Sequence, residues 1–91
     1  MQLDEFRKIC EDNDQLQKVW KMMVETALKV EINELPLALK VYHGKEILKE
    51  EKEIVVEYRE KFNQAVIVLK DACGSFGIEV PTLYVSEICT L

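Results

Sequence analysis

A heptad pattern in the second half of the chain constrains the fold more than any other sequence feature. Within residues 45–75, large apolar side chains recur every seven positions, and further apolar side chains follow three positions after them. This spacing predicts one long amphipathic helix with a coiled-coil-like seam. The a positions are Leu48, Val55, Phe62, Leu69 and Phe76, the following d positions are Tyr58, Ala65 and Ala72, and Glu51 breaks the series at one earlier d position.

The length of this helix raises a geometric problem. A helix of about 30 residues is about 45 Å long, whereas a compact domain of this chain length has a diameter of about 32 Å. Residues 65–69 read A-V-I-V-L, which is apolar around the whole circumference and predicts burial on every side. Because the rest of the chain offers few elements to surround this helix, we expect self-association along it. The alternative is a monomer in which the helix bends or the earlier helices wrap it.

Two helices are expected before it. Apolar residues at three- and four-residue steps predict one helix over residues 3–11 and another over residues 14–30. The polar stretch between them interrupts the pattern, and one of residues 12–14 is expected to cap the second helix. Asp12 with Gln15 three positions later has the spacing of a capping box.

Two segments are ambiguous between helix and strand. Leucines alternate with other residues in 31–44, as in a strand, yet the segment is also rich in helix formers. We favour a short, largely buried helix with Pro36 in its first turn and Gly44 at its C-terminal cap. Residues 78–91 are either extended or contain a short last helix that Pro81 opens and that runs through Glu87.

The predicted fold is therefore mainly α: a small helical bundle with one long C-terminal helix, in a single domain of residues 1–91. Gly77 followed by Ile78 is expected to stop the long helix, with Ile78 folding back on its last turn. The alternative is an α+β fold with a short two-stranded element from residues 35–41 and 83–85.

Charge and hydropathy disfavour two classes of partner. Twelve Lys and Arg stand against seventeen Asp and Glu, and the two signs are interleaved without a basic patch. Direct nucleic-acid binding is therefore not expected. No apolar run approaches the ~20 residues that cross a bilayer, and the first ten residues contain no signal-peptide core. We expect no membrane association and a cytoplasmic location.

The residues that usually carry chemistry are few and scattered. Cys10, Cys73 and Cys89 form no CxxC pair, and in the cytoplasm we expect them to be reduced and to fill the core as small apolar side chains. His43 is the only histidine and stands beside Gly44, where a helix end or turn is expected. We therefore predict no catalytic set, no metal site, no cofactor and no enzymatic activity.

The leading functional prediction is a small acidic protein-interaction module. It would act as a regulator, inhibitor or adaptor by binding another protein, as a homodimer, a role that suits small proteins of bacteria or their phages. Tyr58 and Phe62 are the large aromatic side chains best suited to anchor such a contact, although Phe62 also fits an intrachain core. The predicted interaction residues are Leu48, Val55, Tyr58, Phe62 and Met22, the last because it lies off the apolar stripe that places Trp20 and Met23 in the core.

Two other functions remain open at this point. One is an oligomer that binds or sequesters a small ligand, such as a nucleotide or metabolite, at its interface. The other is a structural subunit of a larger assembly.

Overall fold

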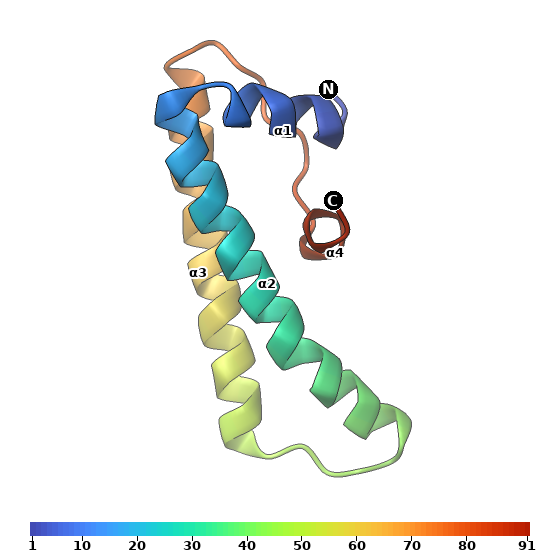
Figure 1. Ribbon diagram of the computed structural model, residues 1–91. Coiled ribbons are helices and arrows are strands. Elements are labelled where there is room, and N and C mark those ends of the chain that lie inside the picture. Colours follow the sequence, from blue (N-terminus) through green and yellow to red (C-terminus); the bar gives the residue numbers. More distant parts are fainter.

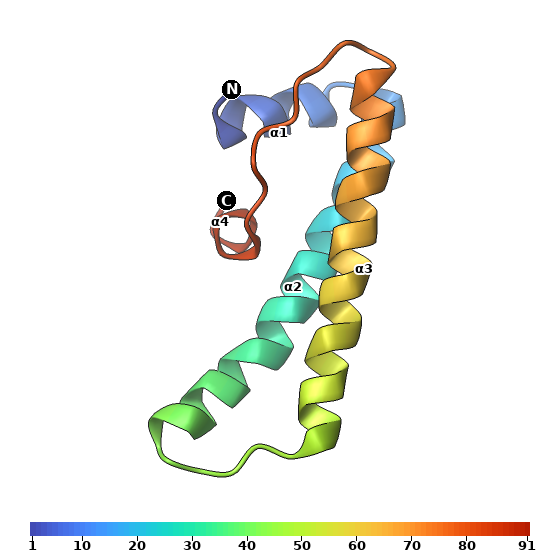
Figure 2. The same ribbon diagram turned by 180° about the vertical axis from the view of Figure 1, so that it is seen from behind.

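The computed structural model describes residues 1–91 and contains four helices, with α2 and α3 forming a long antiparallel hairpin (Figure 1). α1 and α4 lie on the same side of this hairpin in both views (Figures 1 and 2). The molecule measures 47 × 20 × 17 Å. The mainly α prediction is confirmed, and because no segment forms a strand, the two-stranded alternative over residues 35–41 and 83–85 is wrong. The helices are α1 (Leu3–Glu11), α2 (Asp14–Tyr42), α3 (Lys49–Gly74) and α4 (Val85–Cys89).

The junction between α1 and α2 is set by one asparagine. Asn13 has an extended backbone, and its Oδ1 accepts hydrogen bonds from the backbone N–H groups of Gln15 (2.9 Å) and Leu16 (3.2 Å). It thereby satisfies two of the amides that a helix start leaves unpaired. α1 has the predicted bounds, but the predicted capping box is wrong, because Asp12 ends α1 instead of starting α2.

α2 is twelve residues longer than predicted, because residues 31–42 continue it instead of forming a separate helix. Within this continuation, the Nδ2 of Asn33 donates to the carbonyl of Lys29 at 2.7 Å. Pro36 consequently lies in the helix interior, where it supplies no N–H to the carbonyl of Ile32. The good helix formers around Pro36 carry the helix past this missing hydrogen bond.

Gly44 ends α2, as predicted. Its φ of +67° is readily adopted only by glycine, and the N–H of Lys45 then donates to the carbonyl of Lys40 at 2.8 Å. α3 begins at Lys49, four residues later than predicted, and Leu48 is its N-cap.

The predicted long helix in the second half of the chain is present as α3, but it is not the longest helix. α2 has 29 residues and α3 has 26, so α3 packs against a helix of similar length. The assumed compact body of about 32 Å is wrong, because the molecule is 47 Å long.

The C-terminal segment returns along the hairpin after a glycine stop. Gly77 has a φ of +67°, and the N–H of Ile78 donates to the carbonyl of Cys73 at 3.0 Å, which confirms the predicted stop. Residues 78–84 are irregular, and Pro81 does not open a helix. α4 starts at Val85 and buries Ile88 against the core.

The core is one apolar cluster to which all four helices contribute. The rings of Phe6 and Trp20 meet edge to face, with centroids 5.7 Å apart. Trp20 and Met23 are buried, as their place in the stripe predicts. The buried residues are Phe6, Cys10, Leu16, Trp20, Met23, Ala27, Val30, Phe62, Ala65, Leu69, Cys73 and Ile88.

The prediction that residues 65–69 are buried on every side is wrong. Ala65 and Leu69 face α2 and are buried, but Ile67 is 51% exposed and Val68 is 44% exposed. The physical reason is that a hairpin covers one side of each helix, and α1 and α4 pack mainly against α2.

Leu69→Ala is expected to lower the free energy of unfolding by about 2–5 kcal/mol, because it removes a fully buried side chain and leaves a cavity. Ile67→Ala is the matched control on the same helix, and we expect it to change stability by less than about 0.5 kcal/mol. Urea unfolding followed by circular dichroism measures both. Equal effects of the two substitutions would contradict the described core.

Candidate interaction surface

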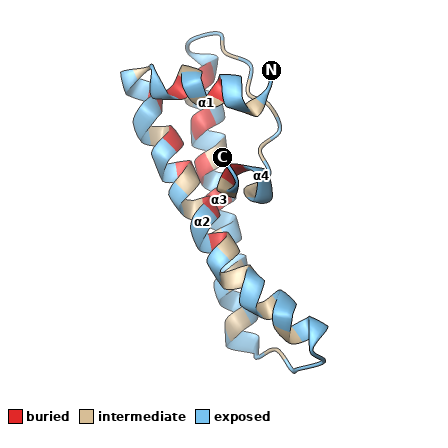
Figure 3. Cartoon of the chain, turned by 45° about the vertical axis from the view of Figure 1, so that its right-hand side comes forward, coloured by how far each residue is buried: buried red, intermediate tan, exposed pale blue.

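The buried core occupies only one half of the hairpin. On α2 the last buried residue is Val30, and on α3 the first is Phe62, so no residue from 31 to 61 is buried. Figure 3 shows this as a band of buried residues at one end and an unburied extension at the other. We call residues 31–61 the distal half of the hairpin.

The distal half is nevertheless rich in large apolar side chains. The prediction that the segment from Leu35 to Tyr42 is buried is wrong, because α1 and the core lie at the other end of the hairpin, and the start of α4 reaches this segment only beside Leu35 and Ala38. Eight of the sixteen exposed large apolar residues of the chain lie here. They are Ile32, Leu35, Leu39, Val41, Tyr42, Leu48, Ile54 and Val56.

Five exposed apolar residues of α2 form a regular stripe, which we call the α2 seam. They follow one another at steps of four, three, four and three residues, the spacing of a coiled-coil seam. At 3.6 residues per turn, this stripe is rotated by about 120° from the buried stripe that faces α3. The members and their exposed fractions are Leu28 (43%), Ile32 (67%), Leu35 (55%), Leu39 (58%) and Tyr42 (84%).

Ion pairs join the two helices of the distal half. Lys40 Nζ lies 2.7 Å from both carboxylate oxygens of Glu51, the residue that breaks the heptad pattern on α3. This hydrogen bond lowers the pKa of the Glu51 carboxyl group below its ordinary value. Arg59 forms a second pair with Glu34. Because all four side chains are partly exposed, these pairs contribute little stability compared with an apolar core.

Tyr58 lies between two lysines at the border of the distal half. The Nζ atoms of Lys29 and Lys61 are 5.9 and 5.3 Å from the centre of its ring, which is within the range of cation–π contacts. Tyr58 is half-buried and packs against the core. Its ring is therefore held in place from both helices.

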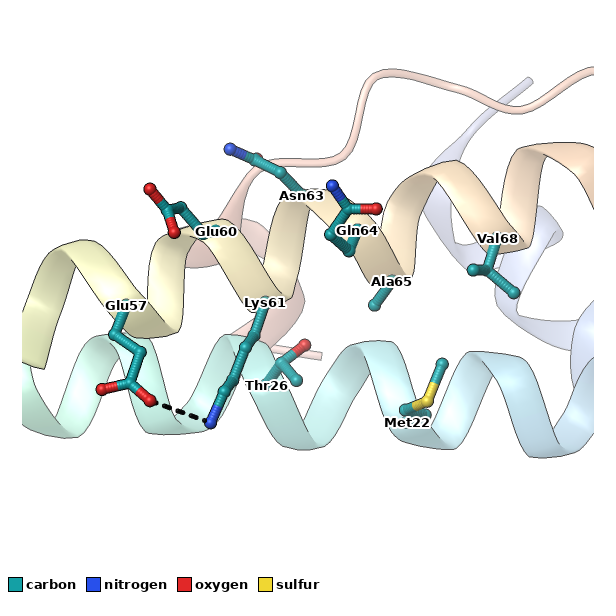
Figure 4. Close-up of a pocket in the computed structure, with 9 residues that line it drawn as sticks. All are labelled: Met22, Thr26, Glu57, Glu60, Lys61, Asn63, Gln64, Ala65 and Val68. Atoms are coloured by element: carbon teal, nitrogen blue, oxygen red, sulfur yellow. Dashed lines mark ion pairs between the residues drawn. The ribbon is translucent and has the colours of Figure 1, made fainter.

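A groove runs between α2 and α3 on the face of the hairpin seen in Figure 4. It has a volume of about 780 Å³ and is lined only by residues of α2 and α3. Met22, Ala65 and Val68 are its apolar residues, and the remaining lining residues are polar. In Figure 4 the Lys61 side chain extends from α3 towards α2. Its Nζ forms an ion pair with Oε1 of Glu57 at 3.3 Å. We call this the Met22 groove.

The five residues that the sequence predicts as interaction residues do not form one patch. Met22 is 42% exposed in its groove, and Leu48 is 57% exposed at the start of α3. Val55 and Tyr58 are half-buried, and Phe62 is 5% exposed within the core, so Phe62 offers a partner almost no surface. Leu48 and Phe62 are also about 21 Å apart along the helix.

Sequence reasoning missed the α2 seam. The signal was present as apolar residues at alternating four- and three-residue steps, but the predicted helix ended at Val30 and divided the seam at that point. The alternation of Leu35, Leu37, Leu39 and Val41 also suggested a strand and hid the helical spacing.

The cysteines are placed as apolar filler. Cys10 and Cys73 are fully buried, and Cys89 is half-buried. Burial and the neighbouring Cys73 raise the pKa of the Cys10 thiol to about 12. Burial also raises the pKa of Cys73. The pKa of Cys89 is raised to about 12 by burial and by the carboxylate of Glu31.

The remaining candidate groups are isolated. His43 is exposed at the end of α2, with its ring edge-on to that of Tyr42 at 5.3 Å. Nowhere do three His, Cys, Asp or Glu side chains come close enough to bind a metal ion together. None of the helices combines the length and the apolar character that spanning a bilayer requires.

Comparison with protein-family models, with curated proteins and with solved structures found no match to this chain.

Treatment of the native protein with a chromogenic disulfide reagent near pH 8 is expected to modify Cys10 and Cys73 far more slowly than the same treatment in denaturant. Burial excludes the reagent, and the raised pKa values leave little thiolate to react. The released chromophore measures the rate. The Cys89→Ser variant is the control, since it leaves only the two buried thiols; their modification at the denatured rate would contradict the described core.

Proposed function

We propose that this chain is a protein-interaction module that binds another protein through the distal half of its hairpin and acts as a regulator, inhibitor or adaptor, as a homodimer. The observation that carries this proposal is the absence of any buried residue from 31 to 61 together with the eight large apolar side chains exposed there. Exposed apolar surface of this extent is typical of interaction sites.

The exposed surface is large enough to drive binding. The exposed fractions of the eight side chains amount to nearly five complete side chains. Burying each complete side chain contributes roughly 1.5–3 kcal/mol, hence about 7–14 kcal/mol in all. Micromolar affinity requires about 8 kcal/mol, and association itself consumes part of the gain. The distal half thus supports contacts of moderate affinity when most of its apolar surface is covered by the partner and by the second copy of the chain together.

The arrangement of the hairpin also favours a binding role. The core, α1 and α4 fix one end, whereas the distal half extends beyond them with both helices accessible. An extended pair of helices can insert into a groove or lie along a partner helix, which is a common mode of recognition.

A second candidate function is the binding of a small ligand, such as a nucleotide or metabolite, at the Met22 groove. The volume of about 780 Å³ is within the range of ligand sites. Its polar lining includes Lys61, the carboxylates of Glu57 and Glu60, and the amides of Asn63 and Gln64, which offer both donors and acceptors to a ligand. A rise of several degrees in the melting temperature with one member of a nucleotide and metabolite panel would favour this function over protein binding.

The double variant Leu48→Glu, Ile54→Glu is expected to abolish capture of a protein partner. Both side chains are exposed on the distal half, 57% and 43% respectively, so the fold does not depend on them. A glutamate at either position would place a charge in the apolar contact with the partner, which is costly to bury. Tagged protein is used to capture partners from the native lysate. The captured protein is then purified, and its affinity for wild type and variant is measured by calorimetry, with at least a tenfold loss expected.

Ile67→Glu is the matched control, because Ile67 has similar exposure on α3 but lies outside the distal half. It should bind like the wild type. Tyr58→Ala tests the border of the surface and should weaken binding less than the double variant. Equal affinity of the wild type and the double variant would rule out the distal half as the binding surface.

A further inference from the structure

The α2 seam is a coiled-coil stripe that this chain leaves unpaired. The helix uses its first stripe, at the same alternating four- and three-residue steps, to pack against α3, and the seam repeats that spacing on another side. We propose that the seam is the site at which a second copy of this chain docks, α2 against α2. This inference deepens the proposed function, because it names the surface that forms the homodimer.

The spacing of the seam specifies the kind of occupant. Side chains at four- and three-residue steps interlock with a helix whose own side chains follow the same steps. Leu28, Ile32, Leu35, Leu39 and Tyr42 are all exposed, and a second copy supplies the same five residues. A twofold axis then makes the contact self-complementary, and it closes without leaving a free seam.

The area fits a dimer. The exposed fractions of the five seam residues amount to about three complete side chains, and a large side chain carries roughly 150–200 Å², so the seam alone offers about 500 Å² per copy. A standard interface buries about 800 Å² per partner. The apolar parts of the side chains that flank the seam, such as Lys29 and Ala38, would supply much of the remaining interface area.

The charges around the seam do not oppose pairing. The chain carries a net charge of −5, which would repel a second copy at an arbitrary contact. From residue 25 to residue 45, however, three lysines balance three glutamates. Lys29 and Glu31 follow Leu28 by one and three positions, so that they flank the seam on opposite sides. The seam is thus a locally neutral stretch of an acidic molecule.

The C-terminal segment leaves the seam open. Leu35 borders a hollow of about 360 Å³ together with Ala38 and with Tyr84 and Val85 from the start of α4. Leu35 itself remains 55% exposed. The next seam residues, Leu39 and Tyr42, do not line this hollow and so do not meet α4 there. The hollow provides space beside the seam for a side chain of the second copy.

Light scattering coupled to size exclusion tests the proposal on the full chain. The wild type is expected to have about twice the mass of a single 10.6 kDa chain at high micromolar concentration. Ile32→Glu and Leu39→Glu place a charge in the seam at positions that are 67% and 58% exposed, so they should shift the protein to the monomer and weaken dimerisation at least tenfold each. Ile67→Glu is the control and should remain a dimer.

Two results would overturn the proposal: a wild type that is monomeric throughout this range, or seam variants that remain dimeric. Circular dichroism is recorded for each variant, and Leu39→Ser replaces any charged variant that loses its helical signal. Leu35→Cys gives an independent reading. Leu35 is the middle residue of the seam and meets its own copy about the twofold axis, so a seam contact predicts rapid disulfide-linked dimers under a thiol oxidant, whereas Ile67→Cys should form few. A monomeric wild type that still loses its partner with Leu48→Glu, Ile54→Glu would rule out the dimer but leave the proposed binding of another protein through the distal half intact.

Discussion

The packing of α2 against the C-terminal half of α3 supplies most of the buried surface, and every other element depends on it. α1 adds Phe6 and Cys10 to this contact and α4 adds Ile88, so both short helices are held by a core they do not form themselves. Since isolated helices of such length are unstable in water, α1 and α4 exist only because that core receives them. The core ends at Val30 and Phe62, and the hairpin extends well beyond it.

Beyond the core, a different kind of contact connects the helices. Lys40 with Glu51 and Arg59 with Glu34 hold the distal helices in register, where an apolar layer would be expected in a closed bundle. Partly exposed ion pairs specify geometry at little gain in stability. The apolar side chains of the distal half are at most half-buried. Polar contacts therefore supply much of the order in the distal half, and a large part of its apolar surface stays uncovered.

Much of the fold was predictable from local rules, and the candidate surface was not. The α1 bounds, Gly44, the Gly77 stop and the burial of Trp20 and Met23 follow from periodicity and cap chemistry, which depend on neighbours in sequence. Whether Leu35 or Ile67 is buried depends on what lies against it, and no local pattern shows that α1 and α4 pack at one end only. Pro36 added to the difficulty, because a proline usually begins a helix, and here it lies within one.

Pro36 also divides α2 mechanically. The carbonyl of Ile32 has no amide partner one turn later, so the helix is less stiff here than in the turns that precede Val30. Those earlier turns are held by packing in the core. The last turns of α2 are therefore joined by a less stiff section to the part of the helix that packs in the core. A small change of angle at this section would swing Leu39 and Tyr42 relative to the core at low energetic cost. The part of α2 in the core is thus fixed, whereas its last turns can change their angle. A helix end of this kind can fit partner surfaces of more than one curvature.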